Sequence, residues 1–264
     1  MFLHSWIPSP TILSLGAFEL RWYGLLLALG AAAGLHILRT LGRKKGFLDT
    51  DLVDLFVWLT VAGFFGGRLY HVLNEFSYYL HHPTQVWMVW EGGLGIHGAM
   101  FAGLVTLILF ARRKKLSAWS LLDVLTPALA LGQVIGRWGN YFNQELFGRP
   151  TDRPWGIPIE AAHRPLSHLD ALYFHPTFLY ESIGNLFIVV ILLWLGQKRS
   201  WPSGVIALVY FLLYGLLRIS TESLRVDQTP IIAGLRLPIL VSGVMILTAL
   251  VILYRKLHHG PKTS

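Results

Sequence analysis

The sequence has no cysteine among its 264 residues. This absence excludes disulfide bonds, cysteine-ligated iron–sulfur clusters and a thiol nucleophile belonging to the protein itself. Charged side chains are also scarce, at 14%, whereas soluble proteins usually carry about 25%. So few charges do not cover the surface of a water-soluble domain of this length. We infer that the chain is embedded in a membrane.

Hydrophobic residues make up 54% of the chain, and they occur in long blocks. A transmembrane helix needs about 20 predominantly apolar residues. Seven segments qualify, at about 16–38, 52–73, 94–111, 119–135, 176–195, 204–221 and 233–254. The sequence predicts an all-α integral membrane protein, a single polytopic domain over 1–264 with a polar loop at about 138–175. We expect no removable signal peptide, because the chain opens with neither a basic segment nor a small-residue cleavage site. We also expect no separate soluble domain before, after or between the seven segments.

Basic residues are distributed unequally between the predicted loops. Thirteen, including all seven lysines, follow alternate helices: Arg39, Arg43, Lys44, Lys45, Arg112, Arg113, Lys114, Lys115, Lys198, Arg199, Arg255, Lys256 and Lys262. Five lie on the other side: Arg149, Arg153, Arg164, Arg225 and Arg236. Loops rich in lysine and arginine stay in the cytosol, so we expect the N-terminus outside and the C-terminus in the cytosol. The net charge of +8 then reflects topology and attraction to anionic lipid, not a nucleic-acid partner.

Four further arginines lie within or at the ends of predicted helices: Arg21, Arg68, Arg137 and Arg218. An arginine at the bilayer centre costs at least roughly 2.5–3.5 kcal/mol, so it persists when it pairs, reaches the interface or binds something. Arg21 and Arg68 have a plain alternative, in which they reach the outer interface or pair with carboxylates such as Glu19 and Glu75.

One polar stripe runs along the sixth predicted helix. Its members are spaced at i, i+4, i+8 and i+11: Tyr214, Arg218, Glu222 and Arg225. At 3.6 residues per turn they share a face, and a polar face on an apolar helix avoids lipid. A purely structural pair of Arg218 with Glu222 is the alternative explanation.

The segment 136–149 follows the fourth predicted helix and mixes glycine, asparagine, glutamate and arginine with aromatic residues. Its glycines permit close backbone approach. Several arginines at headgroup level suit a phosphate, which a guanidinium binds through two parallel hydrogen bonds. The residues by themselves predict a site for an anionic lipid headgroup at the outer leaflet.

Two other polar residues start predicted helices. His97 is either a hydrogen-bonded core residue or a base or proton carrier, since imidazole titrates near neutral pH. Glu181 either orients an arginine or stays protonated, and the sequence does not distinguish these roles.

Acidic and histidine pairs give no persuasive metal site. Asp51 and Asp54 lack the following glycine and distal aspartate of metal-dependent phosphatidyl-group transferases, and acids are favoured at a helix N-terminus in any case. The histidine pairs at 81–82 and 258–259 have no acidic or cysteine partners. We expect no metal and no cofactor.

The segment Gly136-Arg137-Trp138-Gly139-Asn140-Tyr141-Phe142-Asn143-Gln144-Glu145-Leu146-Phe147-Gly148 resembles the signature of the bacterial prolipoprotein diacylglyceryl transferase family at every defining position. Further segments agree in order along the chain: Arg21-Trp22-Tyr23-Gly24, Gly66-Gly67-Arg68, His97-Gly98, and His175-Pro176 through Tyr180-Glu181, with Tyr214-Gly215, Arg218 and Glu222 in the sixth helix.

The resemblance implies a transferase that moves the sn-1,2-diacylglyceryl group of phosphatidylglycerol to the lipobox cysteine thiol of a preprolipoprotein. The products are a thioether and glycerol phosphate, in the first step of lipoprotein maturation. The partners implied are phosphatidylglycerol, the signal-peptide/lipobox segment and membrane lipids, with no metal or nucleotide. The location implied is the bacterial cytoplasmic (inner) membrane, with the active site toward the outer face. The thiol then comes from the substrate, consistent with a chain that has no cysteine.

Matching positions also imply roles for residues. The resemblance assigns Arg137 and Arg218 to the phosphate, where they stabilise charge that develops on the leaving group. His97 is the candidate base. The other catalytic or site-lining residues implied are Tyr23, Asn140, Glu145 and Tyr214, and the other substrate-binding residues are Arg68, Gly148, Glu181 and Glu222.

The chain departs from the family pattern at two places. Ala99 stands where a second glycine usually follows the histidine of the third helix. Before the seventh helix, Ile232, Ala233 and Arg236 stand near the places of a glycine–glutamine pair and a serine. We interpret this second segment as a divergent wall of the substrate entrance.

Two other classes of function also place arginines at headgroup level. A lipid transporter or scramblase is expected to show internal repeats and broken helices, whereas this sequence shows no repeat and gathers its polar groups on one side. A non-catalytic scaffold has no use for a histidine, glutamates and asparagines beside the arginines. Both alternatives predict that no thioether product forms.

Overall fold

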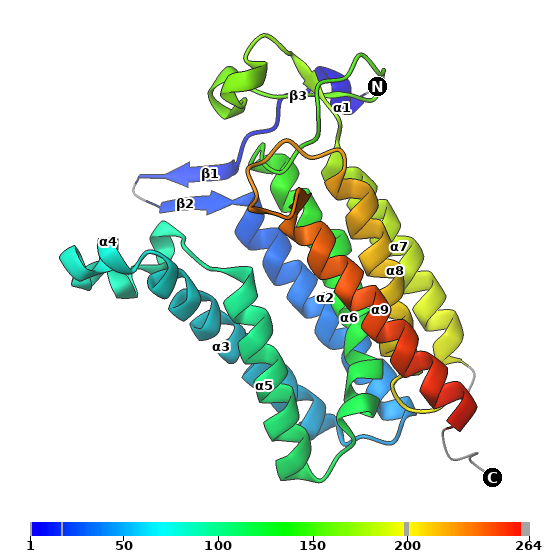
Figure 1. The fold of residues 1–264 in the computed structure, drawn as a ribbon. Helices are drawn as coiled ribbons and strands as arrows, with labels where there is room; N and C mark the ends of the chain where they lie inside the picture. The colour runs from blue at the N-terminus through cyan, green and yellow to red at the C-terminus, as the bar shows by residue number, and fades with distance from the viewer. Residues whose placement is uncertain (1, 17, 198–200, 260–264) are drawn as a thin grey trace. The chain divides into compact units, whose positions relative to one another are not determined.

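The computed structural model describes residues 2–16, 18–197 and 201–259. Lys198, Arg199 and Lys262, which contribute to the charge count, therefore lie outside the described residues. The chain divides into two compact units (Figure 1). One unit is Met1–Ile37 with Asp123–Ser264, and the other is Leu38–Leu122.

The described residues are mostly helical. The helices are α1 (Phe2–Ser5), α2 (Trp22–Lys44), α3 (Asp49–Asn74), α4 (Phe76–His81), α5 (Ile96–Lys114), α6 (Ala118–Phe142), α7 (Thr177–Gly196), α8 (Val205–Glu222) and α9 (Leu237–His259). Short 3-10 turns are η1 (Pro83–Trp87), η2 (Val89–Glu91), η3 (Ala161–His163) and η4 (Leu166–His168). Three antiparallel pairs of short strands complete the order: β1 (Thr11–Leu15) with β2 (Phe18–Arg21), β3 (Ile157–Pro158) with β4 (Tyr173–Phe174), and β5 (Ile231–Ile232) with β6 (Leu235–Arg236).

Seven of these helices, α2, α3 and α5 to α9, are long and apolar enough to cross a membrane. This confirms the predicted helical membrane fold with seven spans. The direction in which the helices cross, and the single domain expected over 1–264, remain predictions.

Helix boundaries differ from the predicted ones where polar residues or short strands intervene. The first span begins at Trp22 rather than at residue 16, because β1 and β2 form a hairpin before it. The last begins at Leu237 rather than at residue 233, because β5 and β6 form a second hairpin. The fourth continues through Pro127 to Phe142, so the first half of the signature segment is helical. Hydropathy does not separate an apolar strand from an apolar helix, and it misses helical turns whose polar side chains face protein.

In the larger unit, α2 and α6 approach closely through small residues. A Cβ added at Gly30 would lie 3.5 Å from the Gly132 carbonyl oxygen, and one at Gly34 would lie 3.4 Å from that of Ala128. Small residues let membrane helices pack backbone against backbone, where dispersion forces act over many atoms. Helices α7, α8 and α9 lie side by side in the same unit (Figure 1).

A buried acid fixes the start of α8. The Asp123 carboxylate, on α6, accepts hydrogen bonds from the backbone N–H groups of Gly204 (2.8 Å) and Ala207 (3.0 Å). These N–H groups have no partner within the helix, and the helix dipole favours negative charge at this end. The contact holds α8 against α6, so the polar residues at the far ends of the two helices keep a fixed relation.

The connection between α6 and α7 is folded around its own aromatic core. Tyr141, Phe147, Ile157, Ile159, Phe174 and Phe178 are buried together there. The ring of His4 stacks on Tyr173 at 4.1 Å, and its Nδ1 lies 2.9 Å from the Gly156 carbonyl oxygen. This core makes the polar connection a rigid element rather than a loose loop.

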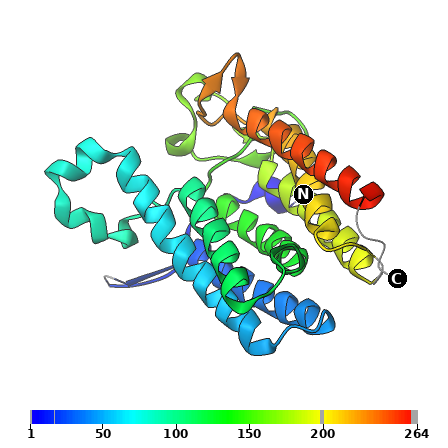
Figure 2. The same cartoon turned by 60° about the horizontal axis from the view of Figure 1, so that its bottom comes forward.

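In the smaller unit, α3 and α5 lie side by side (Figures 1 and 2). A Cβ on Gly98 would meet the Gly66 carbonyl oxygen at 2.2 Å, so no larger residue fits there without movement. The methyl group of Ala99 lies 3.7 Å from where a Cβ on Gly67 would stand. Ala99 therefore packs at ordinary contact distance, and its departure from the family pattern leaves this helix pair closely packed.

Candidate functional site

One carboxylate at the start of α7 holds three arginines. Glu181 is buried, and its Oε2 lies 2.5 Å from Nη2 of Arg137. Its Oε1 lies 3.3 Å from Nη1 of Arg218 and 3.2 Å from Nη1 of Arg225. The two arginines that the resemblance assigns to phosphate, on α6 and α8, are therefore brought together at a single side chain. Of the two roles left open for Glu181, these contacts agree with that of a side chain that orients arginines.

A second buried carboxylate extends this arrangement. Glu222 is fully buried, with Oε2 at 2.6 Å from Nη2 of Arg218 and Oε1 at 2.8 Å from Nε of Arg236. Asp227 lies 2.7 Å from Nε of Arg225 and 3.8 Å from Arg236. We call this set the arginine cluster: Arg137, Arg218, Arg225, Arg236, Glu181, Glu222 and Asp227. With every group ionised, its arginines outnumber its carboxylates by one.

The arginines of the cluster differ in their access to a ligand. The side chains of Arg137 and Arg218 are 19% and 16% exposed, whereas that of Arg225 is 3% exposed. Burial by itself lowers the pKa of Arg225, but the hydrogen bond and charge of Asp227 and the charges of Glu181 and Glu222 outweigh burial and raise that pKa. Arg225 is thus a charged internal member, whereas Arg137, Arg218 and Arg236, whose side chain is 24% exposed, keep part of their charge accessible at the surface of the cluster.

The signature segment supports Arg137 through a chain of amides. Nη1 of Arg137 donates to Oδ1 of Asn140 at 3.3 Å, and Nδ2 of Asn140 donates to Oε1 of Glu145 at 2.8 Å. Asn143 donates to the same Glu145 oxygen at 3.5 Å. Asn140 and Glu145 therefore orient Arg137, which is a role that spacing along the sequence does not reveal.

Gly148, the last residue of the signature segment, lies where two segments of the chain pack closely against each other. A Cβ there would stand 2.8 Å from Cβ of His175, 3.0 Å from Cγ2 of Thr177 and 3.1 Å from the Leu224 carbonyl oxygen. The Gly148 N–H donates to the His175 carbonyl at 2.9 Å, and Gly148 forms a β-bridge with Arg225. Gly148 thus joins the α6–α7 connection to the segment that carries Arg225, and a side chain at this position would force the two apart.

His175, beside Gly148, has a defined hydrogen-bond partner. Its Nδ1 lies 3.0 Å from the Tyr180 hydroxyl, which also accepts a hydrogen bond from Nε1 of Trp155 at 2.8 Å. An indole N–H only donates, so the Tyr180 hydrogen is left for His175. Burial and the nearby charge of Arg153 lower the pKa of His175, which favours the neutral ring that accepts this hydrogen.

Tyrosines named by the resemblance flank the cluster on two helices. Tyr23 opens α2, and a Cβ on Gly139 would meet its ring at 2.7 Å. With Glu19, Leu20, Arg21, Gly24, Leu25 and Asn143, Tyr23 lines a cavity of about 370 Å³. On α8, the ring of Tyr214 stacks on that of Tyr210 at 5.6 Å, one helical turn from Arg218. Both rings therefore lie close to residues of the signature or of the cluster.

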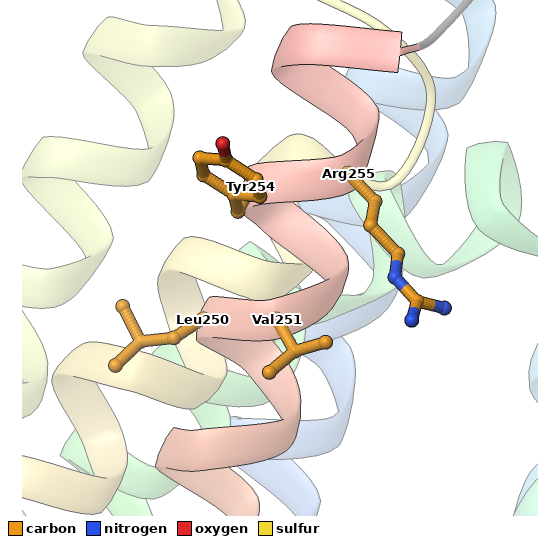
Figure 3. A pocket seen from close by; sticks show the side chains of 4 residues that line it. All are labelled: Leu250, Val251, Tyr254 and Arg255. Atoms are coloured by element: carbon orange, nitrogen blue, oxygen red, sulfur yellow. The ribbon is translucent and has the colours of Figure 1, made fainter.

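A second hollow, also about 370 Å³, lies beside the last turns of α9 and is lined by Leu250, Val251, Tyr254 and Arg255 (Figure 3). All four side chains come from one helix. A tyrosine and an arginine near the end of a spanning helix are typical of an interface anchor. We assign no site to this hollow.

Two residues named by the resemblance belong to the Leu38–Leu122 unit. His97 opens α5, is exposed, and lies with its ring 5.6 Å from that of Tyr70. The core alternative for His97 is therefore wrong, and its role as a base remains a prediction. Arg68, on α3, is buried rather than extended to an interface.

The Arg68 guanidinium binds main-chain carbonyl groups. Its nitrogens donate to the carbonyl oxygens of Gln85 (2.5 Å), Val86 (2.8 Å), Gly92 (2.7 Å), Gly93 (3.2 Å) and Met88 (3.4 Å). Within the described residues these carbonyls, rather than Glu75, are its partners, so that predicted pairing is wrong. The other predicted pairing is confirmed, because Arg21 lies 2.8 Å from Glu19 at an exposed position.

Arg236, Asp227 and the internal role of Arg225 were not predicted as parts of the site. From the sequence, Arg236 stands only among the loop charges, whereas Arg225 stands both among the loop charges and at the end of the polar stripe of the sixth predicted helix. The available signal was an arginine within the apolar segment predicted to span the membrane at 233–254. Among the described residues no group of three or more histidine, aspartate or glutamate side chains is placed to hold a metal ion.

The comparisons with known proteins agree on one family. A family model described as prolipoprotein diacylglyceryl transferase matches residues 10–255. A phosphatidylglycerol–prolipoprotein diacylglyceryl transferase from Synechococcus elongatus is 43% identical over 244 residues, covering 90% of this chain and 84% of the relative. Relatives of the same name from Acaryochloris marina and Synechocystis sp. are also 43% identical, covering 97% and 91% of this chain and 96% and 86% of the relatives. This chain therefore belongs to the prolipoprotein diacylglyceryl transferase family.

Proposed function

We propose that this chain transfers the diacylglyceryl group of phosphatidylglycerol to the lipobox cysteine thiol of a preprolipoprotein, with the chemistry at the arginine cluster. The observation that carries the proposal is the placement of Arg137 and Arg218 on one buried carboxylate, with part of each guanidinium exposed. The names of the relatives supply the two substrates, and the cluster supplies a site for the phosphate of phosphatidylglycerol.

The reaction balances without a further reactant. The sulfur of the thiol forms a bond to the glycerol carbon as the bond from that carbon to the phosphate oxygen breaks. The electron pair of the broken bond leaves with glycerol phosphate, and the thiol proton passes to a base. A free thiol has a pKa of about 8.5, so moderate assistance suffices.

Arg137 and Arg218 bind the phosphate and stabilise the charge that grows on it. Glu181 and Glu222 hold these two guanidiniums in place before the substrate arrives, and Asn140 and Glu145 restrict the rotation of Arg137. Preorganised charge of this kind costs no rearrangement during the reaction. Tyr23, Tyr214 and Gly148 line or shape the site, His97 is the proposed base, and Arg68 contributes to substrate binding through the loop that it holds.

We also propose that the protein lies in the bacterial cytoplasmic membrane with the cluster and the polar loop at about 138–175 toward the outer face. The lysine distribution supports this direction. A cysteine-free chain permits a direct test, because a single cysteine introduced at Leu166 should react with a membrane-impermeant maleimide in whole cells. One introduced at Leu257 should react only after the cells are broken. The reverse pattern would overturn the orientation.

The activity is tested with purified protein, phosphatidylglycerol vesicles and a lipobox peptide, with the thioether product followed by mass spectrometry. We expect product with the wild type and none with Arg137→Ala or Arg218→Ala. Arg137→Lys should also fail, because an ammonium does not reproduce two parallel hydrogen bonds. Arg255→Ala, an exposed change near the end of α9, is the control and should keep activity.

A transporter or a scaffold gives no thioether even with the wild type. That outcome, or full activity in both arginine-to-alanine variants, would refute the proposal.

A further inference from the structure

The hairpin β5–β6 carries an uncharged apolar tip. Ile231, Ile232 and Leu235 are 69%, 53% and 46% exposed, and residues 228–235 include no charged side chain. The turn residues Ala233 and Gly234 have φ angles of +50° and +77°, as a tight two-residue hairpin turn requires. The tip is therefore a defined structure that exposes aliphatic side chains.

The foot of the hairpin is held by Arg236. Its Nε donates to Oε1 of Glu222 at 2.8 Å, Nη1 to the Arg225 carbonyl at 3.2 Å and Nη2 to the Asp227 carbonyl at 2.9 Å. The Leu237 N–H closes the base with a 2.8 Å hydrogen bond to the Pro230 carbonyl. Three acceptors from two segments thus determine where the guanidinium lies, and a displaced hairpin would have to break these bonds.

Glu222 links this foot to the proposed phosphate site. One of its oxygens binds Arg236 and the other binds Arg218, and the side chain is fully buried. A buried carboxylate shared by two guanidiniums cannot follow one of them without changing its geometry at the other. The position of Arg236 therefore influences the position at which Arg218 is held.

The surroundings of the tip favour lipid as its occupant. The hairpin leads directly into α9, a membrane-spanning helix whose outer face exposes Val241, Val244 and Leu247. The aliphatic tip continues that lipid-facing surface, and apolar surface is stabilised by leaving water. The absence of charge at the tip disfavours a purely electrostatic contact with headgroups.

We infer that the tip of the β5–β6 hairpin lies in the apolar edge of the bilayer. In the same inference, Arg236 is a positioning residue: through Glu222, the position of the hairpin affects the position of Arg218. The location of the tip is independent of the proposed function. The coupling to Arg218 rests on that function, and the two experiments are separate for this reason.

The location is tested by labelling single cysteines with an environment-sensitive fluorophore. The label is placed at Ile231→Cys, at Val244→Cys as the lipid-facing reference, and at Leu166→Cys as the exposed loop reference. The protein is then placed in phosphatidylcholine vesicles with brominated acyl chains, which quench fluorophores in the hydrocarbon. Quenching at 231 should approach that at 244 and exceed that at 166 severalfold. Quenching at 231 no greater than at 166 would overturn the inference. So would a label at 231 that only the lipobox peptide shields, because the tip would then be a peptide-binding surface.

The coupling is tested by the kinetics of Arg236→Gln. We expect kcat/KM for phosphatidylglycerol to fall roughly tenfold, the size of one charge-assisted hydrogen bond, with an increase in KM. Arg236→Lys should recover part of the loss because it restores the charge beside Glu222. Arg255→Gln, the matched control, should behave as the wild type.

A merely structural role for Arg236 predicts a lower folded fraction with an unchanged KM, and that result would overturn the coupling. Wild-type kinetics in Arg236→Gln, together with an inactive Arg218→Ala, would overturn the coupling alone. Full activity in Arg218→Ala would instead refute the proposed function.

Discussion

Arginines at the family positions of this chain are held inside the protein in two different ways. Arg68 is buried against carbonyl groups of a single segment, which are neutral, fixed dipoles. Arg137 and Arg218 are partly exposed and oppose carboxylates that they share with other arginines. An arginine that donates hydrogen bonds to main-chain carbonyl groups stabilises the conformation of the segment that carries them. An arginine paired with shared carboxylates, in a cluster with excess positive charge, remains able to bind a further anion.

This comparison explains why the resemblance alone does not separate the two roles. Arg68, Arg137 and Arg218 all match family positions, and all lie within or near the ends of spanning helices. Their partners differ because Arg68 faces a connection that turns five carbonyl groups toward it, whereas the other two face glutamates on α7 and α8. The predictions below test whether this difference in partners is a difference in function.

The largest effect is expected from Glu181→Ala. This change leaves Arg137, Arg218 and Arg225 without their common counter-ion, and breaking a buried ion pair costs about 3–5 kcal/mol. Thermal unfolding in detergent should show the loss, and thioether formation should cease. Glu19→Ala removes the exposed pair with Arg21 and should cost less than about 1 kcal/mol. Equal losses in the two variants would contradict the central place given to Glu181.

Arg68→Ala is expected to destabilise the smaller unit by about 1.5–3 kcal/mol, the range for hydrogen bonds to a charged group. Protease cleavage within residues 82–95 should become faster, and KM for phosphatidylglycerol should rise with it, because the loop that Arg68 holds contributes to substrate binding. An increase in KM with unchanged protease resistance would instead show that Arg68 contacts the substrate itself.

Gly148→Ala is expected to cost about 1–3 kcal/mol, as overpacking does. The added methyl group has no space beside His175 and Thr177, so the α6–α7 connection must move away from Arg225. Transfer activity should fall with stability. Gly243→Ala, where nothing lies within 4 Å of the added carbon, is the control: activity should be unchanged, and stability should be equal or up to about 1 kcal/mol higher, because alanine favours a helix. If Gly148→Ala kept wild-type stability and activity, the α6–α7 connection would not be needed to support the arginine cluster.

The smallest effect is expected from the titration of His175. Burial and the charge of Arg153 lower the pKa of His175, so the unfolded chain binds this proton more readily than the folded protein. Its contribution to stability is therefore complete above the ordinary histidine pKa of about 6.5 and is lost as the pH falls through the lowered value. Unfolding temperatures measured from pH 8 to pH 5 should fall less in His175→Gln than in the wild type. Identical pH profiles would contradict the neutral, hydrogen-bonded ring.

The sequence was sufficient to locate the membrane-spanning helices but not to place their ends. Apolar segments of about 20 residues cross a membrane whatever their neighbours are, so hydropathy alone located seven helices. It placed residues 18–21 and 233–236 in helices, although these segments take part in hairpins, because a short apolar strand has the same composition as a helical turn.

Part of the candidate site was also accessible to sequence analysis. The helical period placed Tyr214, Arg218, Glu222 and Arg225 on one stripe, and the signature singled out Arg137. The period relates residues of one helix only, however. It contains no information on which carboxylate of α7 meets which arginine of α6 or α8, and it gave no reason to add Arg236 or Asp227.

By itself the sequence determined that this chain enters a membrane with seven apolar helices, and which arginines must be compensated there, because the cost of burying a charge depends on the residue rather than on its neighbours. Only the tertiary structure decided how each arginine is compensated. Contacts between helices and hairpins assigned carbonyl groups to Arg68 and shared glutamates to Arg137 and Arg218, because the choice of partner depends on distances that no local pattern encodes.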